Sequence, residues 1–417
     1  MFNQFLRQWG ILPSTNFNIH SCPSLSGKTA IITGGSDGIG ADIVKHLLLN
    51  DIAQVLVLAR NETKFQNSLT KVWRPALSAT PERIDRVRFI PCDTADLAAI
   101  DRTGKDILST LTRLDFLFLN AGRSFDPDYR LSYGVDITFA TNHMGHFHLT
   151  QLLTPLLVAS APSRVIVTSS SLHMVVASKF SFDELVSPTP PTSQGPAWDS
   201  WYRYGRSKLA NILFTRALAQ HLPEGVVPNS FFPGSVPTEA SAGWKYLIGE
   251  FGGSMVTLLL KLVGQTPEQG AATAMYLAVG DVEEVGRGNY FVPVAVKEKT
   301  SLLAADKEWA EELWVWSAEM VERALSAGKG EGASGIEGAG ANEGAGANEG
   351  AGANEGAGAN EGAGANEGAS VNEDASVIEG ASVIEGASVN EGASVSEGAS
   401  VNIPSELLAH PVCLPPA

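Results

Sequence analysis

Tyr204 and Lys208 stand four residues apart, which places a phenol and an ammonium on one face of a helix, one turn from each other. A free phenol has a pKa of about 10 and exchanges protons poorly near neutral pH. A nearby positive charge favours the phenolate and so lowers this pKa. The pair therefore predicts a Tyr general acid or base assisted by a Lys, although this spacing is common and is weak on its own.

A glycine-rich turn over Thr33–Gly40 lies between an apolar strand and a helix. Gly34 allows a tight turn, Gly38 allows a pyrophosphate to approach closely, and Gly40 lets the helix pack on the strand. The helix N-terminus adds unpaired amides and a partial positive charge. In this context the turn predicts a dinucleotide site, with an ordinary strand-to-helix turn as the alternative.

The same glycine turn also fits the G-x-S-x-G pattern of the α/β-hydrolases, in which Ser36 would be a nucleophile. That pattern normally follows several strands, whereas here it follows the first. The later histidines His221 and His410 lie in a helix end and in the C-terminal tail. We therefore prefer the dinucleotide interpretation.

The second predicted strand ends in Arg60. In dinucleotide folds an acidic residue at this point accepts hydrogen bonds from the ribose 2′-OH and favours NAD. A guanidinium cannot accept them but can pair with a 2′-phosphate. Arg60 therefore predicts NADP(H). Lys64, one turn into the next helix, either supports Arg60 or is solvated surface.

Apolar segments alternate with helical stretches through the body of the chain, which predicts an α/β fold with a doubly wound parallel sheet, the Rossmann fold. The runs are continuously aliphatic, as in strands buried on both faces. The predicted strands are Thr29–Gly34, Gln54–Arg60, Arg86–Asp93, Leu114–Gly122, Arg164–Ser170, Val226–Gly234 and Asn289–Val296, and the predicted helices include Gly40–Leu49, Val135–Ala159 and Tyr202–His221.

Composition divides the chain into an N-terminal extension (1–24), a catalytic domain (25–328) and a tail (329–417). Residues 330–417 hold 14 acidic residues and no Lys or Arg, and a six-residue unit of the type EGAGAN or EGASVN repeats twelve times from Glu331. Such units bury too little apolar surface to offset their ordering entropy, so we predict disorder. A short hexapeptide β-helix is the alternative.

Charge and motif content exclude several classes of protein. Without the tail, 31 acidic residues face 29 basic ones, so a basic nucleic-acid surface is not expected. The cysteines Cys22, Cys92 and Cys413 are too far apart for a disulfide framework or a zinc site, and we expect His143, His146 and His148 to pack rather than bind metal, so no metal is predicted.

Targeting signals are weak. The N-terminus lacks an apolar core of signal-peptide length, and no segment has the length and apolarity of a spanning helix. We expect a cytoplasmic protein, with membrane-surface association and homo-oligomer formation left open.

The motifs together resemble the short-chain dehydrogenases/reductases, and within them the retinol-dehydrogenase-like members common in fungal secondary metabolism. The similarity covers roughly residues 20–327. Its pieces are the turn Thr33–Gly40, Asp93, Asn120-Ala121-Gly122, Thr141–Phe147, Arg164–Ser170, Tyr204 to Lys208 and Pro233–Thr238.

This resemblance implies roles for individual residues. Ser170 would bind the substrate carbonyl, with strand alternation favouring it over Ser169 and Ser171. Tyr204 would move the proton, Lys208 would lower the Tyr pKa and hold the nicotinamide ribose, and Asn142 would anchor a water relay. The expected cofactor-binding residues are Gly34, Ser36, Gly38, Ile39, Gly40, Arg60, Lys64, Asp93, Asn120, Ala121, Gly122, Tyr204, Lys208, Val236 and Thr238.

Three features depart from the family pattern. Leu119 replaces the first Asn of N-N-A-G, and Ser36 and Asp37 stand where NADP-preferring members often carry a basic residue. The 34-residue separation of Ser170 and Tyr204 is also long. The expected function is NADP(H)-dependent interconversion of a ketone or aldehyde and an alcohol on a small apolar molecule, in secondary metabolism. The alternatives are a retinol- or steroid-type dehydrogenase of general metabolism, or a cofactor-binding scaffold whose tail recruits partners.

Overall fold

The structure is a computed structural model of the chain, and it describes residues 15, 17–126, 128–187, 189–192, 195–236, 249, 252–255 and 264–330. Most of the N-terminal extension, Thr238 and all but the first two residues of the tail expected to be disordered lie outside the described residues.

An eight-stranded sheet forms the centre of the described part, in the order β10-β9-β8-β7-β4-β1-β2-β3. Its strands are β1 (Thr29–Thr33), β2 (Gln54–Ala59), β3 (Val87–Pro91), β4 (Phe116–Leu119), β7 (Ser163–Thr168), β8 (Val226–Phe231), β9 (Asn289–Val292) and β10 (Val296–Lys297). All neighbours are parallel except β9 and β10. The order reverses between β1 and β4, and a crevice at their carboxyl ends is where such sheets bind ligands.

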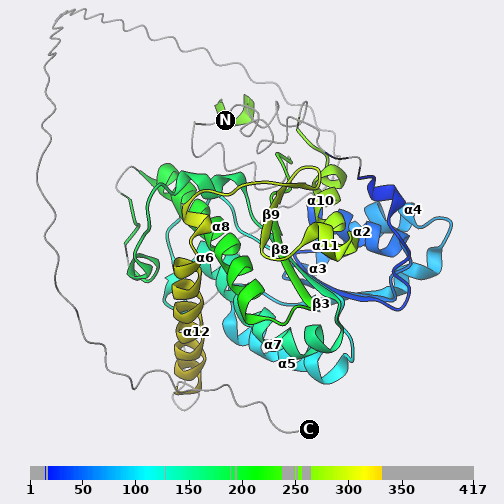
Figure 1. The fold of residues 1–417 in the computed structure, drawn as a ribbon, viewed down its shortest axis with the longest axis horizontal. Helices are drawn as coiled ribbons and strands as arrows, with labels where there is room; N and C mark the ends of the chain where they lie inside the picture. Colours follow the sequence, from blue (N-terminus) through cyan, green and yellow to red (C-terminus); the bar gives the residue numbers. More distant parts are fainter. Residues whose placement is uncertain are drawn as a thin grey trace, which may run out of the picture. The chain divides into compact units, whose positions relative to one another are not determined.

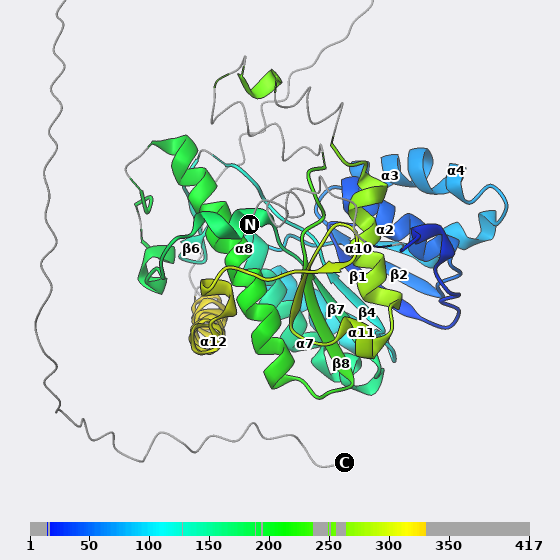
Figure 2. The same cartoon turned by 45° about the horizontal axis from the view of Figure 1, so that its top comes forward.

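Helices cover both faces of the sheet (Figures 1 and 2). The main ones are α2 (Gly38–Leu49), α3 (Glu62–Ser68), α5 (Leu97–Thr110), α7 (Gly145–Ala159), α8 (Pro196–His221), α10 (Pro267–Val279) and α12 (Lys307–Gly330). Shorter helices are α4 (Arg74–Ala76), α6 (Ile137–Phe139) and α11 (Val282–Val285), and a small hairpin pairs β5 (Leu131–Ser132) with β6 (Val135–Asp136). Helices α2 and α10 pack on each other, as α5 packs on α7 and α8 on α12.

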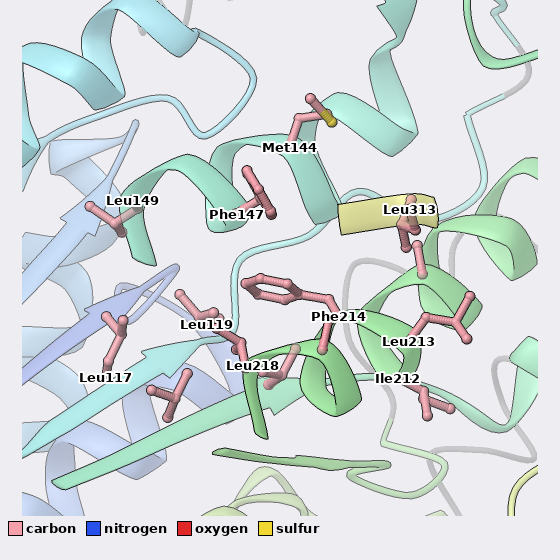
Figure 3. Packing of buried hydrophobic residues seen from close by; sticks show 14 of the residues in the cluster. Leu117, Leu119, Met144, Phe147, Leu149, Ile212, Leu213, Phe214, Leu218 and Leu313 are labelled. Carbon is pink, nitrogen blue, oxygen red and sulfur yellow. The ribbon is translucent and has the colours of Figure 1, made fainter. Parts of the chain in front are cut away.

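Two apolar clusters lie on opposite faces of the sheet because successive strand side chains alternate. Ile31 of β1 belongs to the cluster under α5, α7 and α8, and its neighbour Ile32 belongs to the cluster under α2 and α10. Figure 3 shows the first cluster, in which Phe147 of α7 and Phe214 of α8 lie above Leu117 and Leu119 of β4. The ring centroids of the two phenylalanines are 5.6 Å apart.

The predicted fold class is confirmed, and the predicted strands agree with small shifts at their ends except for Asn289–Val296. That segment forms two antiparallel strands, β9 and β10, with a turn between them. Two helix predictions need correction. The segment Val135–Ala159 begins with β6 and the short α6, and a π-helical segment, Ala140–Met144, precedes α7. Helix α8 begins at Pro196 rather than Tyr202, since proline suits a first helical turn. None of the helices in the described ranges has the length and apolar character needed to cross a bilayer.

Candidate active site

A cleft of about 950 Å³ opens at the carboxyl ends of β1, β2, β4 and β7. It runs from Arg60, Asn61 and Lys64 past the glycine turn to Tyr204 and Lys208. Of the predicted site residues, the cleft is lined by Gly34, Ser36, Gly38, Ile39, Gly40, Arg60, Lys64, Asn120, Ala121, Gly122, Ser170, Tyr204, Lys208 and Val236. The fold thus brings most of them to one place, while Asn142 and Asp93 are not among the residues that line the cleft.

The glycine turn can only be made by glycine at its key positions. Gly34 and Gly38 have φ angles of +66° and +51°, in the left-handed region. A Cβ on Gly40 would stand 2.2 Å from the carbonyl oxygen of Gly34, so α2 packs directly on the end of β1. Asp37 caps α2 by accepting a hydrogen bond from the Gly38 amide at 2.7 Å. This cradle, open to a helix N-terminus, fits the pyrophosphate of a dinucleotide.

The hydrolase alternative is not supported by the described residues. Ser36 is buried, and its carbonyl oxygen accepts a hydrogen bond from Ser68 at 2.9 Å. His221, which would have to serve as the base, lies at the end of α8, where its ring pairs with Glu311 at 2.8 Å. The other candidate base, His410, lies outside the described residues.

Asn120 ties neighbouring strands together at the floor of the cleft. Its side-chain amide donates to the carbonyl oxygens of Thr33 (3.3 Å) and Gly34 (3.2 Å), and its oxygen accepts from Thr168 at 3.5 Å. The ends of β1, β4 and β7 are therefore joined beside the glycine turn.

The first two of the three serines after β7 have different surroundings. Ser169 is buried and donates to the backbone oxygen of Lys208 at 2.7 Å, so its hydroxyl is occupied within the fold. Ser170 caps the short helix Ser171–Val175, accepting from the Leu172 amide at 3.2 Å, and it also hydrogen-bonds Tyr204. Ser170 is thus the serine that joins the Tyr204 phenol in the cleft.

Tyr204 and Lys208 lie one turn apart on α8, with the Lys208 Nζ 5.5 Å from the centre of the Tyr204 ring. Burial raises the pKa of Tyr204 to about 12, although its hydrogen bond with Ser170 acts in the opposite direction. Burial also lowers the pKa of Lys208 to about 8. Burial is the larger influence on Tyr204 in the chain alone, and the expected lowering of its pKa by Lys208 stays a prediction.

Asn142 lies in the π-helical segment before α7 and is fully buried. Its side-chain nitrogen donates to the backbone oxygen of Arg123 (2.9 Å) and to Ser207 (2.8 Å), and its oxygen accepts from the Arg123 amide (2.7 Å). These bonds fasten the loop after β4 to the helix that carries Tyr204. The expected water relay stays a prediction.

The basic residues at the far end of the cleft are paired with carboxylates. Arg60 Nη1 lies 3.6 Å from Asp93, and Lys64 Nζ lies 3.3 Å from Asp37. Arg60 remains more than half exposed. Asp93 also accepts from the Ala95 amide at 2.9 Å, so its expected contact with adenine stays a prediction.

The three expected packing histidines have separate protein partners. His143 bonds Ser317 at 2.8 Å, and His148 lies 3.3 Å from Asp101. His146 donates from Nδ1 to the backbone oxygen of Asn142 (3.0 Å), so its Nε2 accepts from the Thr33 hydroxyl (2.9 Å). Burial lowers the pKa of His146 to about 3, which keeps it neutral.

Sequence reasoning missed the apolar wall near Tyr204. Phe125 packs against the Tyr204 ring, with centroids 5.5 Å apart, and Leu172 and Phe232 also line the cleft there. Ile39 and Val236 meet above Gly270 of α10, whose added Cβ would stand 3.1 and 2.8 Å from them. Phe125 follows the Asn120-Ala121-Gly122 motif by three residues, and this position in the sequence could have indicated that its ring lies near the cleft.

The sequence profile of the family described as short chain dehydrogenase matches residues 28–181. A short-chain dehydrogenase/reductase of Armillaria gallica is 31% identical over 73% of this chain and 93% of its own. Mouse retinol dehydrogenase 13 is 33% identical over 74% of this chain and 89% of its own.

A crystal structure of an uncharacterised protein of Mycobacterium paratuberculosis, 22% identical, covers 74% of this chain and 98% of its own with a TM-score of 0.55, which bears on the fold alone. The length and level of the sequence similarity identify the protein: the chain belongs to the short-chain dehydrogenase/reductase family of NAD(P)-dependent oxidoreductases.

Proposed function

We propose that the protein is an NADP(H)-dependent oxidoreductase that interconverts a ketone or aldehyde and an alcohol on a small apolar molecule. The observation that carries this proposal is the meeting of Ser170, Tyr204 and Lys208 in the cleft that also holds the glycine turn. A bound nicotinamide would supply or accept the hydride. The protein groups would bind the carbonyl oxygen and move its proton.

Tyr204 and Ser170 divide the work at the carbonyl oxygen. With a pKa of about 12, Tyr204 is protonated near neutral pH and ready to donate to an oxygen that gains negative charge. The protonated phenol is the form that carbonyl reduction requires. Ser170, already hydrogen-bonded to Tyr204, would hold the same oxygen in line.

Lys208 holds its position through its Nζ, which donates to the backbone oxygen of Thr168 at 3.1 Å. That contact keeps the ammonium beside Gly122, whose added Cβ would stand 3.5 Å from it. Lys208 would bind the nicotinamide ribose hydroxyls from there. In this proposal Asn142 acts indirectly, by holding the loop after β4 against the helix that carries Tyr204.

The choice of NADP(H) rests on Arg60 and Lys64. Both line the end of the cleft away from Tyr204, and each is held by an exposed carboxylate that a 2′-phosphate could replace. A guanidinium can bind that phosphate in a bidentate manner.

Arg60→Glu is expected to weaken NADPH binding by about 10- to 100-fold while NADH binding changes little, because charge-assisted hydrogen bonds to phosphate are worth about 1.5–3 kcal/mol. Fluorescence titration of both cofactors measures this. Arg88→Glu, at an exposed position on β3, is the control and should bind as wild type. Equal affinity of the wild type for NADPH and NADH would overturn the assignment.

The apolar character of the substrate is supported by Phe125, Leu172 and Phe232 beside Tyr204. Polyketide, terpenoid, steroid and retinoid carbonyls all have the apolar character that matches these side chains. Relatives named retinol dehydrogenase 13 and 14 favour the retinoid-type alternative within the same chemistry. Secondary metabolism, cytoplasmic localisation and the three-part division of the chain stay predictions.

A further inference from the structure

A cluster of two histidines and a glutamate lies outside the cleft, where three elements meet. His20 comes from the short helix η1 (Ile19–Ser21), His46 from α2 and Glu268 from the first turn of α10. One nitrogen or oxygen atom from each of the three side chains lies within 4.8 Å of the other two. They converge although they are far apart in the sequence, so no spacing motif marks them.

Both imidazoles contact the Glu268 carboxylate at hydrogen-bond distance, one at each of its oxygens. His20 Nε2 is 3.2 Å from Glu268 Oε1, and His46 Nε2 is 3.2 Å from Glu268 Oε2. In a tetrahedral zinc site with metal–ligand bonds of about 2.0–2.1 Å, neighbouring ligand atoms are about 3.3 Å apart. The neutral imidazole ring offers one nitrogen lone pair to a metal.

The three side chains differ in exposure, so one side of the cluster is open to solvent. His46 is 1% exposed, whereas Glu268 is 35% and His20 62% exposed. Solvent can therefore reach the position between them, which allows a water as fourth ligand. Two imidazoles and one carboxylate are a donor set that suits Zn²⁺.

Lys45 is the group that competes for this carboxylate. Its Nζ lies 2.6 Å from Glu268 Oε2, and it also pairs with Asp42. Because Lys45 donates to Oε2, the other oxygen, Oε1, remains directed at His20. Asp42 compensates the ammonium, so Lys45 can hold the glutamate in orientation as an outer partner of a metal ligand.

We propose that His20, His46 and Glu268 bind one Zn²⁺ ion and that this ion fastens the N-terminal segment to the cofactor-binding half of the fold. Helix α2 begins at the glycine turn, and Pro267, the residue before Glu268, lines the cleft. A metal there would link both helices to the segment around His20. The proposal departs from the expectation of a chain without metal.

The test is calorimetric titration of Zn²⁺ into the full-length chain after treatment with EDTA, near neutral pH. Wild type is expected to bind one ion per chain and to unfold at a higher temperature with Zn²⁺, because binding to the folded state stabilises it. His20→Ala and Glu268→Gln are expected to bind Zn²⁺ at least tenfold more weakly. His20 is exposed, so its replacement is compatible with folding, which circular dichroism checks.

Two control variants separate this site from other zinc ligands. His221→Ala removes another histidine–glutamate pair, His221 with Glu311, and should leave zinc binding unchanged. Cys22→Ser removes the thiol two residues from His20 and should also leave it unchanged. The proposal is overturned if wild type binds no Zn²⁺, if His20→Ala and Glu268→Gln bind as tightly as wild type, or if Cys22→Ser abolishes binding.

Discussion

Tyr204→Phe is expected to lower kcat by about 10²- to 10⁴-fold and to change NADPH affinity much less, because the variant removes the proton donor and keeps the ring. The phenylalanine ring keeps the packing against Phe125, whose centroid lies 5.5 Å away. It loses the hydroxyl that hydrogen-bonds Ser170. Steady-state turnover of a carbonyl substrate and a fluorescence titration of NADPH measure the two quantities separately.

Tyr202→Phe is the matched control for this prediction. Tyr202 is also half-buried on α8, but its ring lies under the Arg206 guanidinium, 5.2 Å from its centre, and it does not line the cleft. This variant should turn over as wild type. Wild-type kcat in Tyr204→Phe, or an equal loss in Tyr202→Phe, would contradict the assignment of the proton donor.

Gly40→Ala is expected to abolish measurable dinucleotide binding and to destabilise the fold by about 1–3 kcal/mol, the usual cost of overpacking. The added Cβ would stand 2.2 Å from the Gly34 oxygen and 2.8 Å from the Asn120 side-chain nitrogen. Backbone atoms cannot rotate away, so α2 must move off β1 and the phosphate cradle opens. Denaturant unfolding and NADPH titration measure the two effects.

Gly104→Ala on α5 serves as the control for the glycine turn. Its added Cβ would meet the end of the Leu152 side chain at 2.5 Å, which can move, and alanine favours a helix. We expect a smaller change in stability and unchanged NADPH affinity. If Gly40→Ala binds NADPH as wild type does, the glycine turn is not the pyrophosphate site.

The sequence was sufficient to predict the strands and the residues at their carboxyl ends. Short aliphatic runs such as Gln54–Ala59 are typical of buried strands, and parallel order then brings the turn after β1 to the segment after β4. Residues on one helix, such as Tyr204 and Lys208, are related by the helix repeat itself. These spatial relations follow from the geometry of a single strand or helix, so the sequence pattern is enough to predict them.

Tertiary contacts could not be predicted from the sequence, because residues far apart in the chain form them and no regular spacing marks them. The pKa of Tyr204 is raised because the folded chain buries the phenol, and that burial depends on tertiary packing such as the contact with Phe125. The pairing of Arg60 with Asp93 joins the ends of two different strands. His46 showed no signal at all, because its partner Glu268 lies 222 residues further along the chain.

The measurement that tests the central claim most directly is the ratio of alcohol formed to NADPH consumed. Wild type is incubated with NADPH and a panel of apolar ketones and aldehydes, including a retinal and a steroid ketone, and products are quantified by mass spectrometry. The account predicts one alcohol per NADPH for at least one member and none with Tyr204→Phe. An absence of NADPH-dependent alcohol from every member, or equal formation by Tyr204→Phe, would contradict it.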